Sequence, residues 1–176
     1  MAAEISQQEL DRLSVDCRAL MEARRSLLLS TLAADGMPEL SYAPYLRDDD
    51  GSFYIYISQL ASHTRNLLQH PKAGVLFIRE ESESRNLFAR ERLSFRCEAV
   101  EIDRQGEHYR AVLARMAQCH GSMITMLREL PDFRLFRLVP QSGSYVVGFG
   151  RAFEVEPASG ALRHIDADRL QARAGA

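Results

Sequence analysis

RSLLLSTLAADGMPELSYAPYL, residues 25–46, is the stretch that decides the fold. Leucines dominate residues 25–33, and aromatic and aliphatic side chains recur through residues 39–46, so each run favours a strand. Asp35 followed by Gly36 between two such runs is a strong short-range signal for a hairpin turn. The stretch therefore predicts two antiparallel strands joined by a tight connection.

The same turn chemistry recurs at Asp50 and Gly51, just before SFYIYIS, residues 52–58, which predicts a third strand. Gly148 and Gly150 indicate a bulge or a close approach of the backbone near the end of the chain. Further apolar runs predict strands at residues 73–79, 92–102, 133–140 and 144–155. Six or seven strands with short connections predict a mostly antiparallel, mainly β barrel in an α+β frame.

Three segments have the periodicity of helices. Residues 6–25 and 105–128 predict long amphipathic helices, and residues 61–70 predict a short one that stops at Pro71. Residues 81–91, which connect two strands, are helical or irregular.

The chain of 176 residues fits about one domain. We place that domain at residues 1–156, including the N-terminal helix, and expect residues 157–176 to form a C-terminal tail that is a weak helix or a mobile arm.

The composition excludes several classes of protein. The net charge is -2 with a pI near 6.2, so no basic surplus points to nucleic acid. Apolar runs such as AGVLFI are too short to span a bilayer, which predicts no membrane partner. Cys17, Cys97 and Cys119 are widely spaced, and the N-terminus is unlike a signal peptide, so we expect a reduced, cytoplasmic protein.

Familiar catalytic and metal-binding motifs are absent from the sequence. The five histidines form no metal-binding spacing, and the sequence has no nucleophile elbow, P-loop or dinucleotide-binding glycine pattern. The start of the helix at residues 61–70 is more informative, because a helix N-terminus favours phosphate or carboxylate. Ser62 is placed to cap it, and Arg65 to bind an anion. The plainer interpretation is an ordinary cap and a solvated arginine.

Two further places carry candidate site residues. Arg90 and Arg92 stand at the start of a strand, where they either deter edge-to-edge aggregation or point into a cleft. Asp132 precedes the apolar run at residues 133–140, either as a turn residue at the strand entry or as a partner across a subunit interface.

Several of these segments, taken together and in order, resemble one family. They are LLLSTLAADGMPELSYAPY (27–45), ISQLASHTRNLLQHPKAGVLF (57–77), LFARERLSF (87–95), LPDFRLFRL (130–138) and YVVGFG (145–150). The chain resembles the split-barrel proteins of the pyridoxamine 5'-phosphate oxidase-like superfamily over about residues 20–155, and within it the HugZ/HutZ-type haem-utilisation proteins. The resemblance implies a six-stranded antiparallel split β-barrel with flanking helices, a homodimer, and a cofactor cleft at the dimer interface that holds FMN or haem.

The resemblance also implies roles at the start of the short helix. Flavin oxidases of the superfamily hold the FMN phosphate with an arginine on an early strand and a lysine at the start of this helix. Here residues 39–46 carry no arginine, and His63 stands at the lysine position. Ser62, Arg65 and the helix dipole remain to support a phosphate. The haem-utilisation branch shares the SHxRNL form, which includes His63 and Asn66.

In the haem-utilisation branch, an arginine of the ARERL segment lies on the distal side of the haem; Arg92 is the match here, and Arg90 is its neighbour. Asp132 matches the group that orients a proximal histidine across the interface. That histidine comes from the C-terminal tail, where His164 is the only candidate for the haem iron. It falls several residues before the expected place, which Asp168, Arg169 or Leu170 occupies. The plainer interpretation of His164 is a surface side chain.

Three functions follow as hypotheses. The first is a haem-utilisation protein that binds haem at its dimer interface, with oxidative degradation of the haem and release of iron as its activity. The second is an FMN-binding oxidoreductase of the pyridoxamine 5'-phosphate oxidase-like class. The third is a non-catalytic binding module on the same scaffold, since a fold does not determine a function.

Overall fold

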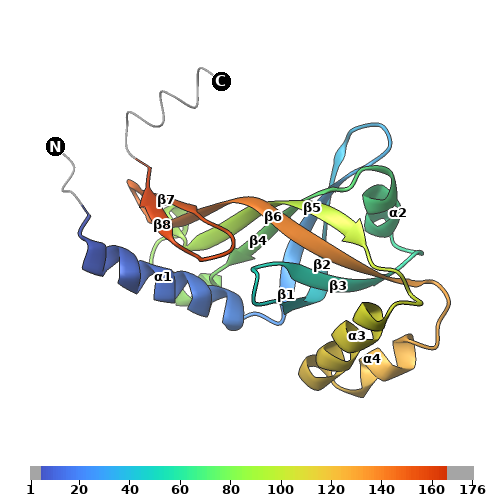
Figure 1. Ribbon diagram of the computed structural model, residues 1–176. Coiled ribbons are helices and arrows are strands. Elements are labelled where there is room, and N and C mark those ends of the chain that lie inside the picture. The colour runs from blue at the N-terminus through green and yellow to red at the C-terminus, as the bar shows by residue number, and fades with distance from the viewer. Residues whose placement is uncertain (1–4, 166–176) are drawn as a thin grey trace.

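Six antiparallel strands close a barrel in the computed structural model, which describes residues 5–165 (Figure 1). The strands are β1 (Ser26–Leu32), β2 (Pro38–Arg47), β3 (Phe53–Ser58), β4 (Lys72–Ile78), β5 (Arg92–Glu101) and β6 (Phe133–Gly148). They lie in the order β3-β2-β1-β4-β5-β6, and β6 pairs again with β3 to complete the ring. The predicted six-stranded antiparallel barrel is therefore confirmed.

Tight turns set the register of the first strands. Gly36 has a φ of 82°, which a residue with a side chain rarely adopts, and the turn aligns Thr31 with Glu39 across β1 and β2. Gly51, with a φ of 86°, makes the β2–β3 turn, where an added Cβ would lie 2.3 Å from the carbonyl oxygen of Pro157. Both aspartate–glycine pairs therefore act as the sequence predicts.

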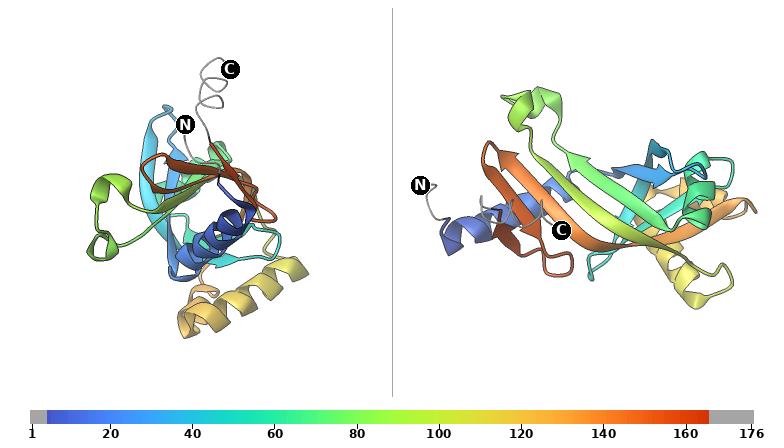
Figure 2. Two further views of the ribbon diagram at one scale, coloured as in Figure 1. Left: turned by 90° about the vertical axis from the view of Figure 1, so that its left-hand side faces the viewer. Right: turned by 90° about the horizontal axis from the view of Figure 1, so that it is seen from above.

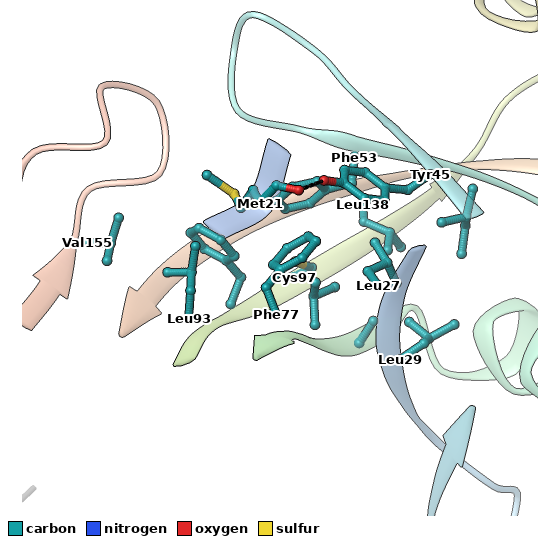
Figure 3. Packing of buried hydrophobic residues seen from close by; sticks show 14 of the residues in the cluster. Met21, Leu27, Leu29, Tyr45, Phe53, Phe77, Leu93, Cys97, Leu138 and Val155 are labelled. Carbon is teal, nitrogen blue, oxygen red and sulfur yellow. Dashed lines mark hydrogen bonds between the residues drawn. The ribbon is translucent and has the colours of Figure 1, made fainter. Parts of the chain in front are cut away.

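The barrel interior is filled by aromatic and aliphatic side chains from all six strands (Figure 3). The Phe53 ring lies 5.7 Å from that of Phe77 and 5.5 Å from that of Phe95, measured between centroids. Helix α1 (Gln7–Glu22) contributes four buried residues to the same cluster, and the hydroxyl of Tyr45 donates to the carbonyl of Met21 at 2.8 Å. Helix α1 therefore packs onto the barrel as part of its core.

Strand β6 is longer than expected. The sequence predicts separate strands at 133–140 and 144–155, but β6 continues through this gap and the chain turns only at Gly150. A register shift opposite Arg96 and Cys97 absorbs one extra residue near Pro140, so the strand passes the proline without ending. The bulge expected at the glycines is confirmed by a second shift before Gly148, and β7 (Arg151–Val155) follows.

The predicted helix at residues 105–128 is two helices, α3 (Glu107–His120) and α4 (Ser122–Leu127). Gly121 between them has a φ of 80°, which ends the first helix and redirects the chain. Apolar side chains of the two helices form a second core on the outside of the barrel with residues of β2, β3 and β6. Figure 2 shows this pair standing apart from α1.

The two irregular segments are also ordered. Residues 81–91 contain two short 3-10 turns, η1 (Glu81–Glu83) and η2 (Leu87–Ala89). Of the tail expected at residues 157–176, the structure describes only the part up to residue 165, where β8 (Leu162–His164) pairs with β7 and extends the sheet. Asp168, Arg169 and Leu170 lie outside the described residues. No helix within residues 5–165 is long and apolar enough to cross a membrane.

Candidate functional site

Helix α2 (Ser62–Gln69) begins differently from the prediction. Its N-cap is Ala61, and Ser62 is an exposed residue inside the first turn, so the prediction that Ser62 caps the helix was wrong. The turn before the helix is held by Ser58, whose carbonyl accepts from the Thr64 hydroxyl at 2.5 Å and whose hydroxyl oxygen accepts from the Leu60 amide at 3.1 Å. Ser62 is thereby left open to a ligand.

Asn66 fastens α2 to the first hairpin. Its side chain is buried, and its amide nitrogen donates to the Thr31 hydroxyl oxygen at 3.0 Å and to a Glu39 carboxylate oxygen at 2.9 Å. The predicted cofactor-binding residue is therefore engaged within the protein, where it sets the position of its neighbours His63 and Arg65. Arg65 is exposed and His63 is half-buried.

Burial lowers the pKa of the His63 imidazole below its usual 6.5, while the charge of Glu39 opposes this effect. Below 6.5 the unfolded chain therefore binds more protons at this residue than the folded chain does. The free energy of unfolding should thus rise with pH across the interval between the folded pKa and 6.5, with no further contribution above it.

We expect the stability of wild type to fall relative to a His63→Gln variant as the pH drops from about 7.5 to about 5.5. Urea unfolding of both proteins at the two pH values measures this difference. If wild type and His63→Gln differ in unfolding free energy by the same amount at both pH values, the lowered pKa of His63 would be contradicted.

Asp132 lies at the same end of the barrel as α2. Its carboxylate oxygen Oδ2 accepts from the Ser58 hydroxyl at 2.5 Å, and its carbonyl accepts from the Gln59 amide at 2.8 Å. Strand pairing between Ser58 and Phe133 creates this contact. Asp132 therefore anchors the turn that opens α2, and its predicted role toward a histidine stays a prediction.

Arg90 and Arg92 lie elsewhere. Arg92 opens β5, pairs with Ile78 and Val146, and donates to the Arg90 carbonyl at 3.1 Å. Its side chain shares the outer face of β5 with Ser94 and Arg96, because inward and outward residues alternate along this strand. Arg90 donates to the Arg79 carbonyl at 2.5 Å and pairs with Glu81 at 3.1 Å.

The predicted site residues therefore form two groups in one chain. Thr31, which holds α2, pairs with Ala73 at one end of β4, and Arg92 pairs with Ile78 at the other end. At about 3.3 Å per residue, these two positions of β4 lie roughly 17 Å apart. Figure 1 likewise shows α2 and the β7–β8 hairpin at opposite ends of the barrel.

A groove of about 790 Å³ runs over the outer face of the sheet between these groups. Its lining includes Leu28, Leu40, Leu76, Ser94, Arg96 and Ser144. Leu28 and Leu40 are 45% and 85% exposed, although both are leucines on regular strands. An exposed apolar surface of this kind marks an interaction site. We call it the interface groove.

His164 ends β8. Its Nε2 lies 3.2 Å from the Gly150 carbonyl oxygen, and its ring centroid lies 5.3 Å from that of Phe153. The side chain is half-buried, so the structure places it within the sheet extension and not on a free arm. Within residues 5–165 no group of three or more His, Cys, Asp or Glu side chains is arranged to hold a metal ion.

Comparison with known proteins places this fold and these residues in a family. The sequence model for Pyridoxamine 5'-phosphate oxidase matches residues 13–147, which is most of the chain. The chain belongs to the pyridoxamine 5'-phosphate oxidase family.

This family member is 38% identical to the protein named Heme oxygenase HutZ of Vibrio cholerae over 156 residues, 88% of each chain. The crystal structure of HutZ from Vibrio cholerae, described there as a heme storage protein, superposes with a TM-score of 0.71 at 36% identity and covers 77% of this chain and 96% of that one. Campylobacter jejuni ChuZ gives a TM-score of 0.79 at 28% identity, over 94% of this chain and 65% of that one. The resemblance predicted from the sequence motifs is confirmed.

Several residues that build the site of this pyridoxamine 5'-phosphate oxidase family member were not predicted from the sequence. They are Thr31, Glu39, Ser58 and Thr64. Ser58 and Asp132 are 74 positions apart, and nothing local to either indicates their contact. Thr64 offered a weak signal, as a hydroxyl residue in the first turn of the helix predicted at residues 61–70.

Proposed function

We propose that this member of the pyridoxamine 5'-phosphate oxidase family binds haem between two copies of the chain and degrades it oxidatively, with release of iron. The observation that carries the proposal is the 38% identity to Heme oxygenase HutZ over 88% of both chains. The structural likeness to the haem storage protein of the same name supports the haem-binding part separately.

A homodimer is part of this proposal. The two groups of site residues lie too far apart in one chain to meet across a narrow cleft, and the interface groove lies between them. A two-fold axis through the groove would bring the α2 end of one copy against the Arg92 end of the other. It would cover the exposed Leu28 and Leu40, and it would create two equivalent sites.

The residues present fit a haem. A porphyrin needs apolar walls, cations for its propionates and a nitrogen ligand for its iron. Leucines of the interface groove supply apolar surface and Arg96 lines it, while Arg65 on α2 and Arg92 at the start of β5 are cations toward opposite ends of the barrel. His63 and His164 are the half-buried imidazoles nearest these ends, and we take His164 as the candidate axial ligand, as the sequence resemblance implies.

The chain's own residues then have distinct roles. Arg92 binds an anionic group of the ligand from the outer face of β5, and Asp132 holds the turn that opens α2 by accepting the hydrogen bond from the Ser58 hydroxyl. The exposed first turn of α2, with Ser62 and Arg65, binds a second anionic group. Bound haem supplies the iron, which activates oxygen when electrons are provided.

FMN is the second candidate ligand, and the family match favours it. The open N-terminus of α2 suits a phosphate. Against it, Arg47, the arginine within β2, lies at the end of that strand opposite to Glu39 and α2. His63 is in addition a weaker phosphate partner than a lysine, because its lowered pKa keeps the imidazole neutral.

Parallel titrations of the purified protein with haemin and with FMN test the proposal. We expect a saturable haemin spectrum and no saturable FMN binding. Arg92→Ala should weaken haemin binding by about ten- to a hundredfold, since a hydrogen bond to a charged group contributes roughly 1.5–3 kcal/mol. Arg85→Ala, which removes an exposed arginine from the same connection, should leave the haemin titration unchanged.

The outcomes separate the three functions. Saturable FMN binding without a saturable haemin spectrum would favour the second function, an FMN-binding oxidoreductase. Haemin binding without loss of haem absorbance under a reductant and oxygen would make the protein a binding module. A histidine-type spectrum that persists in His164→Ala would overturn the axial assignment and leave haem binding intact.

A further inference from the structure

Glu91 lies directly before β5, between Arg90 and Arg92 in the sequence. Its side chain is only 13% exposed and reaches inward to the hydroxyl of the buried Tyr145. One carboxylate oxygen accepts from the Tyr145 hydroxyl, and the other accepts from Nε and Nη2 of Arg79. Every oxygen of this nearly buried carboxylate therefore has a partner.

Both partners of Glu91 are themselves fixed. Tyr145 is fully buried on β6 and pairs with Leu93, and burial together with the adjacent carboxylate raises the pKa of its hydroxyl, which stays a donor. The Arg79 amide donates to the Glu91 carbonyl at 3.0 Å, and the Arg79 carbonyl accepts from Arg90 at 2.5 Å. These bonds close the base of the connection between β4 and β5.

Glu91 and Leu93, the two chain neighbours of Arg92, both face the interior, so Arg92 faces outward. Successive residues of a strand point to opposite faces, and a slip of one residue would exchange the faces of the whole strand. With Glu91 held inside, Arg92 is directed outward onto the face of β5 that lines the interface groove. The single hydrogen bond from Arg92 to the Arg90 carbonyl is local and does not select a face by itself.

We propose that Glu91, clamped by Tyr145 and Arg79, is a positioning residue that holds Arg92 toward the outer face of β5, the face on which Ser94 and Arg96 line the interface groove; this rests on the proposed function, in which Arg92 binds the haem. A purely structural Glu91 would only satisfy the buried Tyr145 hydroxyl and close the connection. The two roles differ in one measurable respect. A positioning residue loses its effect on the ligand once Arg92 is removed.

The experiment is a double-mutant cycle on haemin affinity. Tyr145→Phe keeps the buried ring and removes the hydroxyl that holds Glu91, and Glu91→Gln keeps the size and removes the charge. Each should weaken haemin binding about three- to tenfold in the wild-type background, toward the lower end of the coupling known within one hydrogen-bond network. Neither should weaken it further in an Arg92→Ala background. Thermal unfolding of each variant shows that the proteins are folded.

Glu83→Gln is the matched control, because Glu83 also pairs with Arg79, at 3.7 Å, but is exposed. It should leave haemin affinity unchanged in both backgrounds. The positioning role would be overturned if Tyr145→Phe lowered haemin affinity equally in the wild-type and Arg92→Ala backgrounds. It would also be overturned if Tyr145→Phe did not lower haemin affinity at all. If wild type itself shows no saturable haemin binding, the proposed function fails and this inference fails with it. If wild type binds haemin but Arg92→Ala binds equally well, only the inference fails.

Discussion

An arginine in place of Leu28 should separate the two copies of the chain and abolish haemin binding at the same time. Leu28 lies on the outer face of β1 within the interface groove and is 45% exposed, so the substitution leaves the barrel core untouched. In the proposed dimer, however, it would bury an unpaired charge on each side of the two-fold axis. Such burial costs several kcal/mol, so the dimer dissociation constant should rise by at least about a hundredfold.

Sedimentation equilibrium, combined with the haemin titration, measures both consequences. Met123→Arg is the control, because Met123 on α4 is 55% exposed and lies outside the groove. It should stay dimeric and bind haemin like wild type. A Leu28→Arg protein that remains a dimer would place the interface elsewhere. A monomer that still binds haemin would show that one chain suffices for the site.

Replacement of Gly143 by valine should produce the largest loss of stability. A Cβ at this position would lie 2.7 Å from a ring carbon of Phe95 and 2.8 Å from the Cβ of Val155. The Phe95 ring is fixed in the barrel core beside Phe53, so it has little room to move. Overpacking a closely packed interior typically costs about 1–3 kcal/mol, and we expect about 3 kcal/mol or more here because two neighbours are contacted.

Denaturant unfolding of Gly143→Val against wild type gives this value directly. Gly148→Ala on the same strand is the matched control, since an added Cβ there meets nothing within 4 Å and its φ is not positive. It should change the unfolding free energy by less than about 1 kcal/mol, in the stabilising direction if at all. Equal losses in the two variants would mean that backbone effects, and not the Phe95 contact, dominate.

Much of the barrel was predictable because its signals are local. Alternation of apolar side chains predicts strands, and the pairs Asp35–Gly36 and Asp50–Gly51 predict the first two turns; both turns form with a positive φ at glycine. The errors arose where a local signal was overridden. Helical periodicity continues across Gly121, but its left-handed backbone divides α3 from α4, and a bulge carries β6 past Pro140 where the pattern predicts a break.

The sequence by itself determined the family, the antiparallel barrel, and which residue types are available for a ligand. Only the tertiary structure decided which of them meet. Ser58 and Asp132 are joined across the closure between β3 and β6, 74 positions apart, and Glu91 reaches Tyr145 across 54 positions. The physical reason is that periodicity and turn chemistry act within a few residues, whereas contacts across a closed barrel depend on the register of every strand between them. That register places Asp132 and Arg92 at opposite ends of the barrel, and the site we propose therefore needs a second copy of the chain.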